Sequence, residues 1–136
     1  MFRFSPTEHW GVGIIVTYPT NEAGMVKRVV SRVLRTYADH SPYVLNVHGG
    51  PMQRVGVPDL LVVIDGLAVF LEVKFQRPGE SAQHARGRAS AVQLAQIDRL
   101  REAGATAAVI LDEEEALAVI DGALKKLSDP VALSGD

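Results

Sequence analysis

The chain has 136 residues, a formal net charge of −2, no cysteine and a hydrophobic content of 47%. This length fits a single domain with a sizeable core, and this composition argues against an intrinsically disordered chain. The lack of cysteine excludes disulfide bonds and thiolate zinc sites. No apolar run approaches the ~18 residues of a membrane span, and the first residues show no signal-peptide pattern. We therefore expect a cytoplasmic protein.

The first half of the chain predicts a helix followed by a strand. Residues 1–19 show no clear periodicity, although residues 12–16 fit a short strand or arm. Thr20 or Asn21 can cap a helix that runs to about Ala38. Apolar side chains recur on one face of this helix: Val26, Val29, Val30, Val33, Leu34 and Tyr37. Residues 43–48 then predict a first strand.

The central part of the chain predicts a β-hairpin. Two apolar runs flank Asp65-Gly66, a dipeptide typical of two-residue hairpin turns. If these two residues form the whole loop, Ile64 pairs with Leu67. Counting outward from that pair places Asp59 directly opposite Glu72, with their Cβ atoms about 5 Å apart. Both strands are apolar on both faces, which is typical of strands in the centre of a covered sheet.

The hairpin predicts a cluster of three charges at its open end. Side chains alternate along a strand, so Lys74 shares the face of Glu72. Like charges that lie opposite each other are destabilising, and the strands that carry Asp59 and Glu72 are otherwise apolar. Two carboxylates beside an ammonium can bind a hard divalent cation and stabilise an anion. We interpret the cluster as a functional site; the alternative is three solvated charges at strand ends.

The rest of the chain predicts a polar loop, a helix, a buried strand and a last helix, over residues 76–89, 90–103, 107–111 and 113–127. Gly104 ends the first of these helices as a left-handed cap. Asp112 caps the last one, and the acids that follow it complement the helix dipole, so we interpret that acidic run as structural. The helical crossover before the last strand implies a mixed sheet covered on both faces.

The order and spacing of these motifs carry a resemblance. Pro58-Asp59 followed by Glu72-Val73-Lys74 resembles the PD-(D/E)XK nuclease superfamily. Four further segments extend this resemblance: Asn46-Val47-His48-Gly49-Gly50-Pro51, Ser90-Ala91-Val92-Gln93, Leu100 and Ala103-Gly104-Ala105. Together with them, the chain resembles the VRR-NUC family over roughly residues 20–120. The resemblance is strongest to the small stand-alone phage and bacterial members of that family. The resemblance implies an α/β restriction-endonuclease-like core, αβββαβ with a C-terminal helix, and a mixed sheet flanked by helices. We expect an N-terminal arm at 1–19, the nuclease domain at 20–128 and a tail at 129–136.

The resemblance implies a metal-dependent DNA endonuclease that leaves a 5′-phosphate. Asp59, Glu72 and the carbonyl of Val73 would bind Mg²⁺ or Mn²⁺, since oxygen ligands favour these hard ions. Lys74 would orient the attacking water or neutralise charge on the phosphorane. Similar nucleases place a glutamate on the first helix and a glutamine on the second near the metal, which correspond to Glu22 and Gln93. By spacing alone, Glu22 fits an acid that complements a helix dipole, and Gln93 fits an exposed helix residue.

The candidate DNA contacts are His48, Arg54, Arg77, Arg86 and Arg88. Residues 1–101 hold twelve basic and eight acidic side chains, a net charge of +4, while residues 102–136 carry −6. The positive net charge of residues 1–101, which contain the predicted site, is therefore compatible with phosphate binding. The alternative for the loop arginines is a solvated, mobile basic segment.

Three further expectations concern the substrate and the working form. The resemblance implies branched or otherwise structured DNA, such as a four-way junction, and a homodimer. The apolar segment near Phe2, Phe4 and Trp10 is a candidate dimer surface, and the alternative is an arm packed on its own sheet. Two other functions stay open: an inactive nuclease-fold module that only binds nucleic acid, and a small nucleotide binder. The latter lacks support, because no G-x-G-x-x-G or P-loop motif is present.

Overall fold

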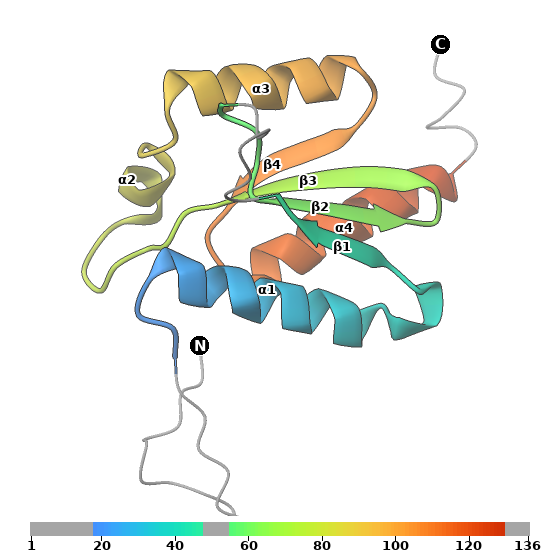
Figure 1. The fold of residues 1–136 in the computed structure, drawn as a ribbon, viewed down its shortest axis with the longest axis horizontal. Helices are drawn as coiled ribbons and strands as arrows, with labels where there is room; N and C mark the ends of the chain where they lie inside the picture. Colours follow the sequence, from blue (N-terminus) through green and yellow to red (C-terminus); the bar gives the residue numbers. More distant parts are fainter. Residues whose placement is uncertain (1–17, 48–54, 130–136) are drawn as a thin grey trace, which may run out of the picture.

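The computed structural model describes residues 18–47 and 55–129, which form a mixed α/β fold with one four-stranded sheet flanked by helices (Figure 1). The strand order is β1-β2-β3-β4; the first three strands pair antiparallel, and β4 runs parallel to β3. The strands are β1 (Tyr43–Asn46), β2 (Leu60–Ile64), β3 (Leu67–Val73) and β4 (Thr106–Ile110). The helices are α1 (Glu22–Thr36), the 3₁₀ turn η1 (Ala38–His40), α2 (Ala82–Arg86), α3 (Ala91–Glu102) and α4 (Glu113–Leu127).

The predicted hairpin is confirmed, including its register. Asp65 and Gly66 form the whole connection between β2 and β3, and both have positive φ, at 50° and 81°. Positive φ at both central residues is the requirement of the turn that matches the twist of a hairpin. Ile64 pairs with Leu67, and the ladder continues to Leu60 opposite Leu71.

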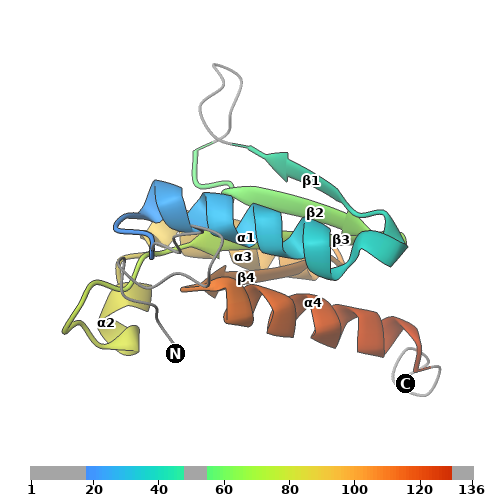
Figure 2. The same ribbon diagram turned by 90° about the horizontal axis from the view of Figure 1, so that it is seen from below.

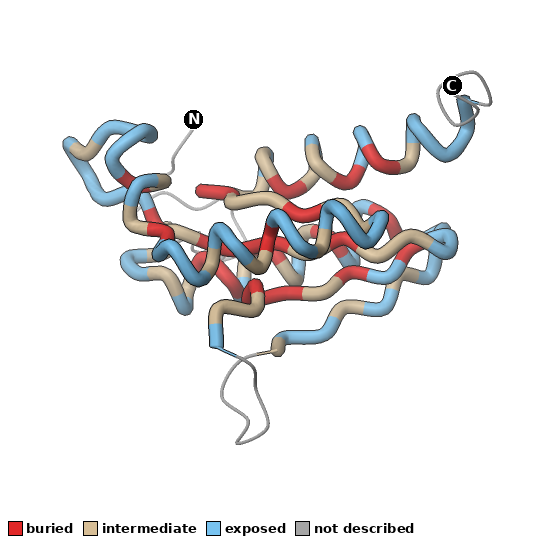
Figure 3. The backbone as a smooth tube through the Cα atoms, turned by 90° about the horizontal axis from the view of Figure 1, so that it is seen from above, coloured by how far each residue is buried: buried red, intermediate tan, exposed pale blue. Residues whose placement is uncertain are grey.

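The helices cover the two faces of the sheet unequally. α1 and α4 lie side by side on one face, and α3 lies on the opposite face (Figures 1 and 2). The core cluster joins buried residues of α1, β2, β3 and α4 and therefore lies between the sheet and the α1–α4 layer. Figure 3 marks the buried residues in red along the backbone. Tyr37, just after α1, ties the two helices together because its hydroxyl donates to Asp121 of α4 at 2.5 Å.

Capping residues fix the ends of the helices where the sequence predicts them. The Asn21 side chain accepts from Gly24 N at the start of α1, and Asp112 accepts from Glu115 N at 2.9 Å at the start of α4. The acids after Asp112 face arginines: Glu113 pairs with Arg28 at 3.1 Å. The predicted capping role of Asp112 is therefore confirmed.

Two details differ from the sequence prediction. Leu34 is 45% exposed rather than on the buried face of α1, since Val33 and Val29 occupy the side toward the sheet and α4. Residues 76–89 are not all loop, because they contain α2, which Ser81 caps by accepting from His84 N at 3.1 Å. A helix of five residues is too short to show the apolar periodicity on which the prediction depends.

Several predicted features lie outside the described residues. They include His48 and Arg54, most of the expected N-terminal arm and most of the expected tail, so the domain boundaries stay a prediction. The first strand ends at Asn46 in the described part. Within residues 18–47 and 55–129, no helix has the length and apolarity that crossing a membrane requires.

Candidate active site

Asp59 and Glu72 are the buried charged residues of the described part of the chain, each only 2% exposed. Glu72 is the penultimate residue of β3, and Asp59 immediately precedes β2. The ladder between β2 and β3 ends at the Leu60–Leu71 pair, and Asp59 and Glu72 are the next residues on the two segments, at the end of the hairpin away from the turn. Burial of two carboxylates is costly unless they are hydrogen-bonded or paired with charge.

Each acid has a defined polar partner. Oδ2 of Asp59 accepts a hydrogen bond from the backbone N–H of Val73 at 2.8 Å. Oε2 of Glu72 lies 3.3 Å from Nζ of Lys74 and accepts from Nε2 of Gln93 at 2.9 Å. The structure thus brings Asp59, Glu72, Lys74 and Gln93 together, from the hairpin and from the first turn of α3.

The electrostatics of the pair favour protonation of one acid. Burial, followed by the nearby charge of Asp59, raises the pKa of Glu72 from 4.5 to about 7. Lys74 opposes this shift through its charge and its hydrogen bond, without cancelling it. The net effect of these neighbours is that the Glu72 carboxyl binds a proton more readily than an exposed glutamate does.

The orientation of the Gln93 amide follows from a capping box at the start of α3. The Ser90 hydroxyl accepts from Gln93 N at 3.1 Å, and Oε1 of Gln93 accepts from Ser90 N at 2.9 Å. Because the amide oxygen is occupied by the backbone of Ser90, the amide NH₂ points to Glu72. The same residue caps its own helix and contacts the acidic pair.

A glycine lets α3 approach the segment that carries Asp59. Gly56 has a φ of +85°, and a Cβ atom there would lie 2.5 Å from Cγ1 and 3.0 Å from the carbonyl oxygen of Val92. The first turn of α3 therefore packs directly against the backbone just before Asp59. This contact was not predicted from the sequence, although a positive φ is a common reason for glycine in a loop.

The site offers oxygen ligands for a hard divalent cation. Asp59 and Glu72 supply two carboxylates, and the chemistry of this donor set fits Mg²⁺ or Mn²⁺ rather than zinc. The negative charge of Glu22, in the first turn of α1, also raises the pKa of Glu72. However, no group of three or more His, Cys, Asp or Glu side chains suited to a metal forms within residues 18–47 and 55–129.

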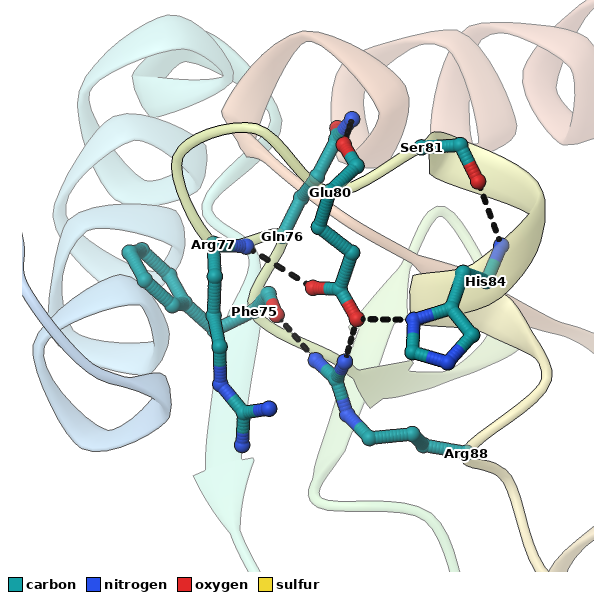
Figure 4. Close-up of polar contacts among 7 residues, drawn as sticks. All are labelled: Phe75, Gln76, Arg77, Glu80, Ser81, His84 and Arg88. Atoms are coloured by element: carbon teal, nitrogen blue, oxygen red, sulfur yellow. Dashed lines mark hydrogen bonds and ion pairs between the residues drawn. The ribbon is translucent and has the colours of Figure 1, made fainter.

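The three loop arginines that the structure describes differ in their surroundings. Arg86 pairs with Glu115 and donates to the carbonyl oxygen of Val109 at 3.2 Å. Arg88 pairs with Glu80 and also donates to a backbone carbonyl. Arg77 is exposed, and its guanidinium is turned away from Glu80 (Figure 4). Arg86 and Arg88 are thus not free solvated cations, and contact of any of the three with DNA stays a prediction.

Comparison with known proteins yields a structural neighbour. No protein-family model matches the chain, and no curated protein sequence matches it. A solved structure described as "VRR_NUC domain" is similar at 25% sequence identity and a TM-score of 0.47, with 70% of this chain and 92% of that chain covered. The neighbour bears the family name that the sequence motifs suggest.

Proposed function

We propose that the chain is a metal-dependent DNA endonuclease that hydrolyses phosphodiester bonds. The observation that carries this proposal is the buried pair of Asp59 and Glu72, with Lys74 at 3.3 Å and Gln93 at 2.9 Å from the same Glu72 oxygen. A carboxyl whose pKa is raised by burial and by a second buried carboxylate is typical of sites that bind a positive ligand. Beside an ammonium, such a ligand site suits an anionic substrate such as a phosphodiester.

Asp59, Glu72 and the carbonyl of Val73 would hold Mg²⁺ or Mn²⁺, and Glu22 would act through a water molecule. When bound, the ion supplies a Lewis acid for the phosphate and lowers the pKa of a coordinated water. The side chains of the chain do the remaining work. Lys74 donates to the water or to the phosphate oxygens, and Gln93 holds the Glu72 carboxylate in one orientation.

Several features of the substrate and assembly belong to the same proposal. Arg77 offers an exposed guanidinium to the DNA backbone, and His48 and Arg54 precede Asp59 in the sequence at positions outside the described residues. The product carries a 5′-phosphate, branched DNA is the preferred substrate, and the working form is a homodimer. Light scattering of the full chain and of a variant lacking residues 1–16 tests the dimer.

The decisive experiment is a nicking assay with purified protein on duplex, flap, splayed and four-way DNA, with Mg²⁺, Mn²⁺ or EDTA. We expect cleavage that needs the metal and that Lys74→Ala abolishes. Lys27→Ala is the matched control, because Lys27 is an exposed lysine on α1 and its loss should leave the rate unchanged. Equal rates in wild type and Lys74→Ala would point to a contaminating nuclease. Metal-independent DNA binding without any cleavage would instead identify an inactive binding module.

A further inference from the structure

The segment between Lys74 and Gln93 connects the two halves of the site. Lys74 directly follows β3, and Gln93 lies in the first turn of α3, with residues 75–92 between them. Gln93 reaches Glu72 at 2.9 Å only if this connection sets α3 at the correct distance from β3. Phe75, Ala85 and Ala89 are the buried residues of this connection, and most of its other residues are polar. Polar contacts therefore help to fix its shape.

Arg88 joins the beginning of this connection to its end. Its Nη2 donates to the carbonyl oxygen of Phe75, the residue that directly follows Lys74 (Figure 4). Arg88 itself lies two residues before Ser90, the N-cap of α3. One guanidinium thus ties the backbone beside Lys74 to the backbone that leads into the Gln93 turn.

Glu80 holds that guanidinium in place. Its carboxylate pairs with Nη1 of Arg88, lies 2.6 Å from Nδ1 of His84, and accepts from Arg77 N at 2.9 Å (Figure 4). The carbonyl of Glu80 also accepts from Nε2 of Gln76 at 2.7 Å. The Glu80 side chain is only 8% exposed, although it lies in a surface loop. The backbone N–H of Arg77, more than any other partner, holds the pKa of this carboxyl below its usual value.

We propose that Glu80 and Arg88 are positioning residues, whose ion pair and contact with the Phe75 carbonyl hold Gln93 against Glu72. The expected effect on the cleavage rate rests on the proposed nuclease function. The expected effect on the Gln93–Glu72 hydrogen bond does not depend on that function. A fork that makes two directed hydrogen bonds at once is a property of arginine that lysine cannot reproduce. A role in the binding of DNA would depend mainly on the positive charge of Arg88, and lysine would preserve that charge.

The first test observes Gln93 directly and needs no activity. In ¹⁵N-labelled protein, the side-chain NH₂ resonances of Gln93 are identified by their loss in Gln93→Ala. We expect Arg88→Ala, Arg88→Lys and Glu80→Gln to move these resonances toward the positions of exposed glutamine amides. Gln83→Ala is the control, because Gln83 is exposed on α2, and its loss should leave the Gln93 resonances unchanged. Unchanged Gln93 resonances in folded Arg88→Ala and Arg88→Lys would overturn the proposal.

The second test separates positioning from DNA binding. For Arg88→Lys and Glu80→Gln we expect kcat to fall about 10- to 100-fold, as a misplacement of about 1 Å does, while KM changes less than about threefold. Full rescue by Arg88→Lys, with a raised KM in Arg88→Ala, would identify Arg88 as a charge contact to DNA and reject the positioning role. If wild type cleaves no DNA, the proposed function fails, and the resonance experiment alone decides whether Glu80 and Arg88 position Gln93.

Discussion

Gln93 donates a hydrogen bond to Glu72 at 2.9 Å across the gap between α3 and β3, while its amide oxygen caps the helix on which it lies. Because one side chain makes both contacts, the position of α3 and the environment of the acidic pair depend on each other. A change of charge at Glu72 alters the partner of Gln93, and a change in the α3 cap alters the surroundings of Glu72.

Stability without metal should fall as the pH rises from about 4.5 to about 7. The pKa of Glu72 is about 7 in the folded chain and 4.5 in the unfolded one, so the folded state binds more protons in this window. At low pH the buried Glu72 carboxyl is protonated and costs the folded state little. As the pH rises and this carboxyl ionises, the free energy of unfolding therefore decreases. The loss amounts to roughly 3 kcal/mol at most, at 1.36 kcal/mol per unit of pKa. Chemical denaturation in EDTA at pH 5 and pH 8 measures it.

Glu72→Gln is the control for this pH dependence, because it removes the titrating group and keeps its shape. As the pH rises from 5 to 8, the unfolding free energy of the wild type should fall relative to that of this variant. A difference that stays constant from pH 5 to pH 8 would show that Glu72 titrates in the fold as it does in the unfolded chain.

A divalent cation should stabilise the wild type through Asp59. A ligand that binds only the folded state adds about 2.7 kcal/mol at a hundredfold excess over its dissociation constant. Mn²⁺ should therefore raise the melting temperature of the wild type and not that of Asp59→Asn. Asp39→Asn changes an exposed aspartate of η1 and should respond to Mn²⁺ like the wild type. Equal melting shifts in all three proteins would place the bound ion elsewhere.

Gly56→Ala should destabilise the chain by about 1–3 kcal/mol, since the new methyl group meets the backbone of Val92 and φ is +85°. Gly122→Ala is the matched control, because a Cβ atom there meets nothing within 4 Å and the residue lies inside α4. That substitution should stabilise by roughly 0.5–1 kcal/mol. Denaturation midpoints measure both changes, and a neutral Gly56→Ala would show that α3 can shift away without cost.

The sequence predicts the site best where a short local motif is compatible with only one backbone geometry. A two-residue turn at Asp65-Gly66 allows one register, and that register brings Asp59 and Glu72 to the same end of the hairpin, directly beyond the Leu60–Leu71 pair. Asp112 likewise marks the start of α4, since a capping side chain and an apolar repeat agree there. The family resemblance comes from the same motifs.

The contacts that complete the site could not be predicted from local pattern. α2 is too short for periodicity, and the pairing of Arg88 with Glu80 depends on how a polar loop folds back on itself. The contact of Gly56 with Val92 joins residues that are distant in the sequence. The exposure of Leu34 depends on how α1 rests against the sheet and α4, which no single-helix pattern contains.

Gln93→Glu should convert a hydrogen bond into a repulsion. Glutamate suits the same position of the capping box, so the start of α3 keeps its cap. The new carboxylate would face Oε2 of Glu72, where the amide NH₂ now donates, and Lys74 would be the adjacent cation for three acids. In EDTA at pH 8 we expect a loss of about 1–3 kcal/mol of unfolding free energy, which falls at pH 5 and is largely reversed by Mn²⁺. Gln96→Glu, one turn further along α3, adds the same charge outside the acidic pair and should show neither effect. Identical denaturation curves for the two variants would mean that the Gln93 side chain does not face Glu72 in solution.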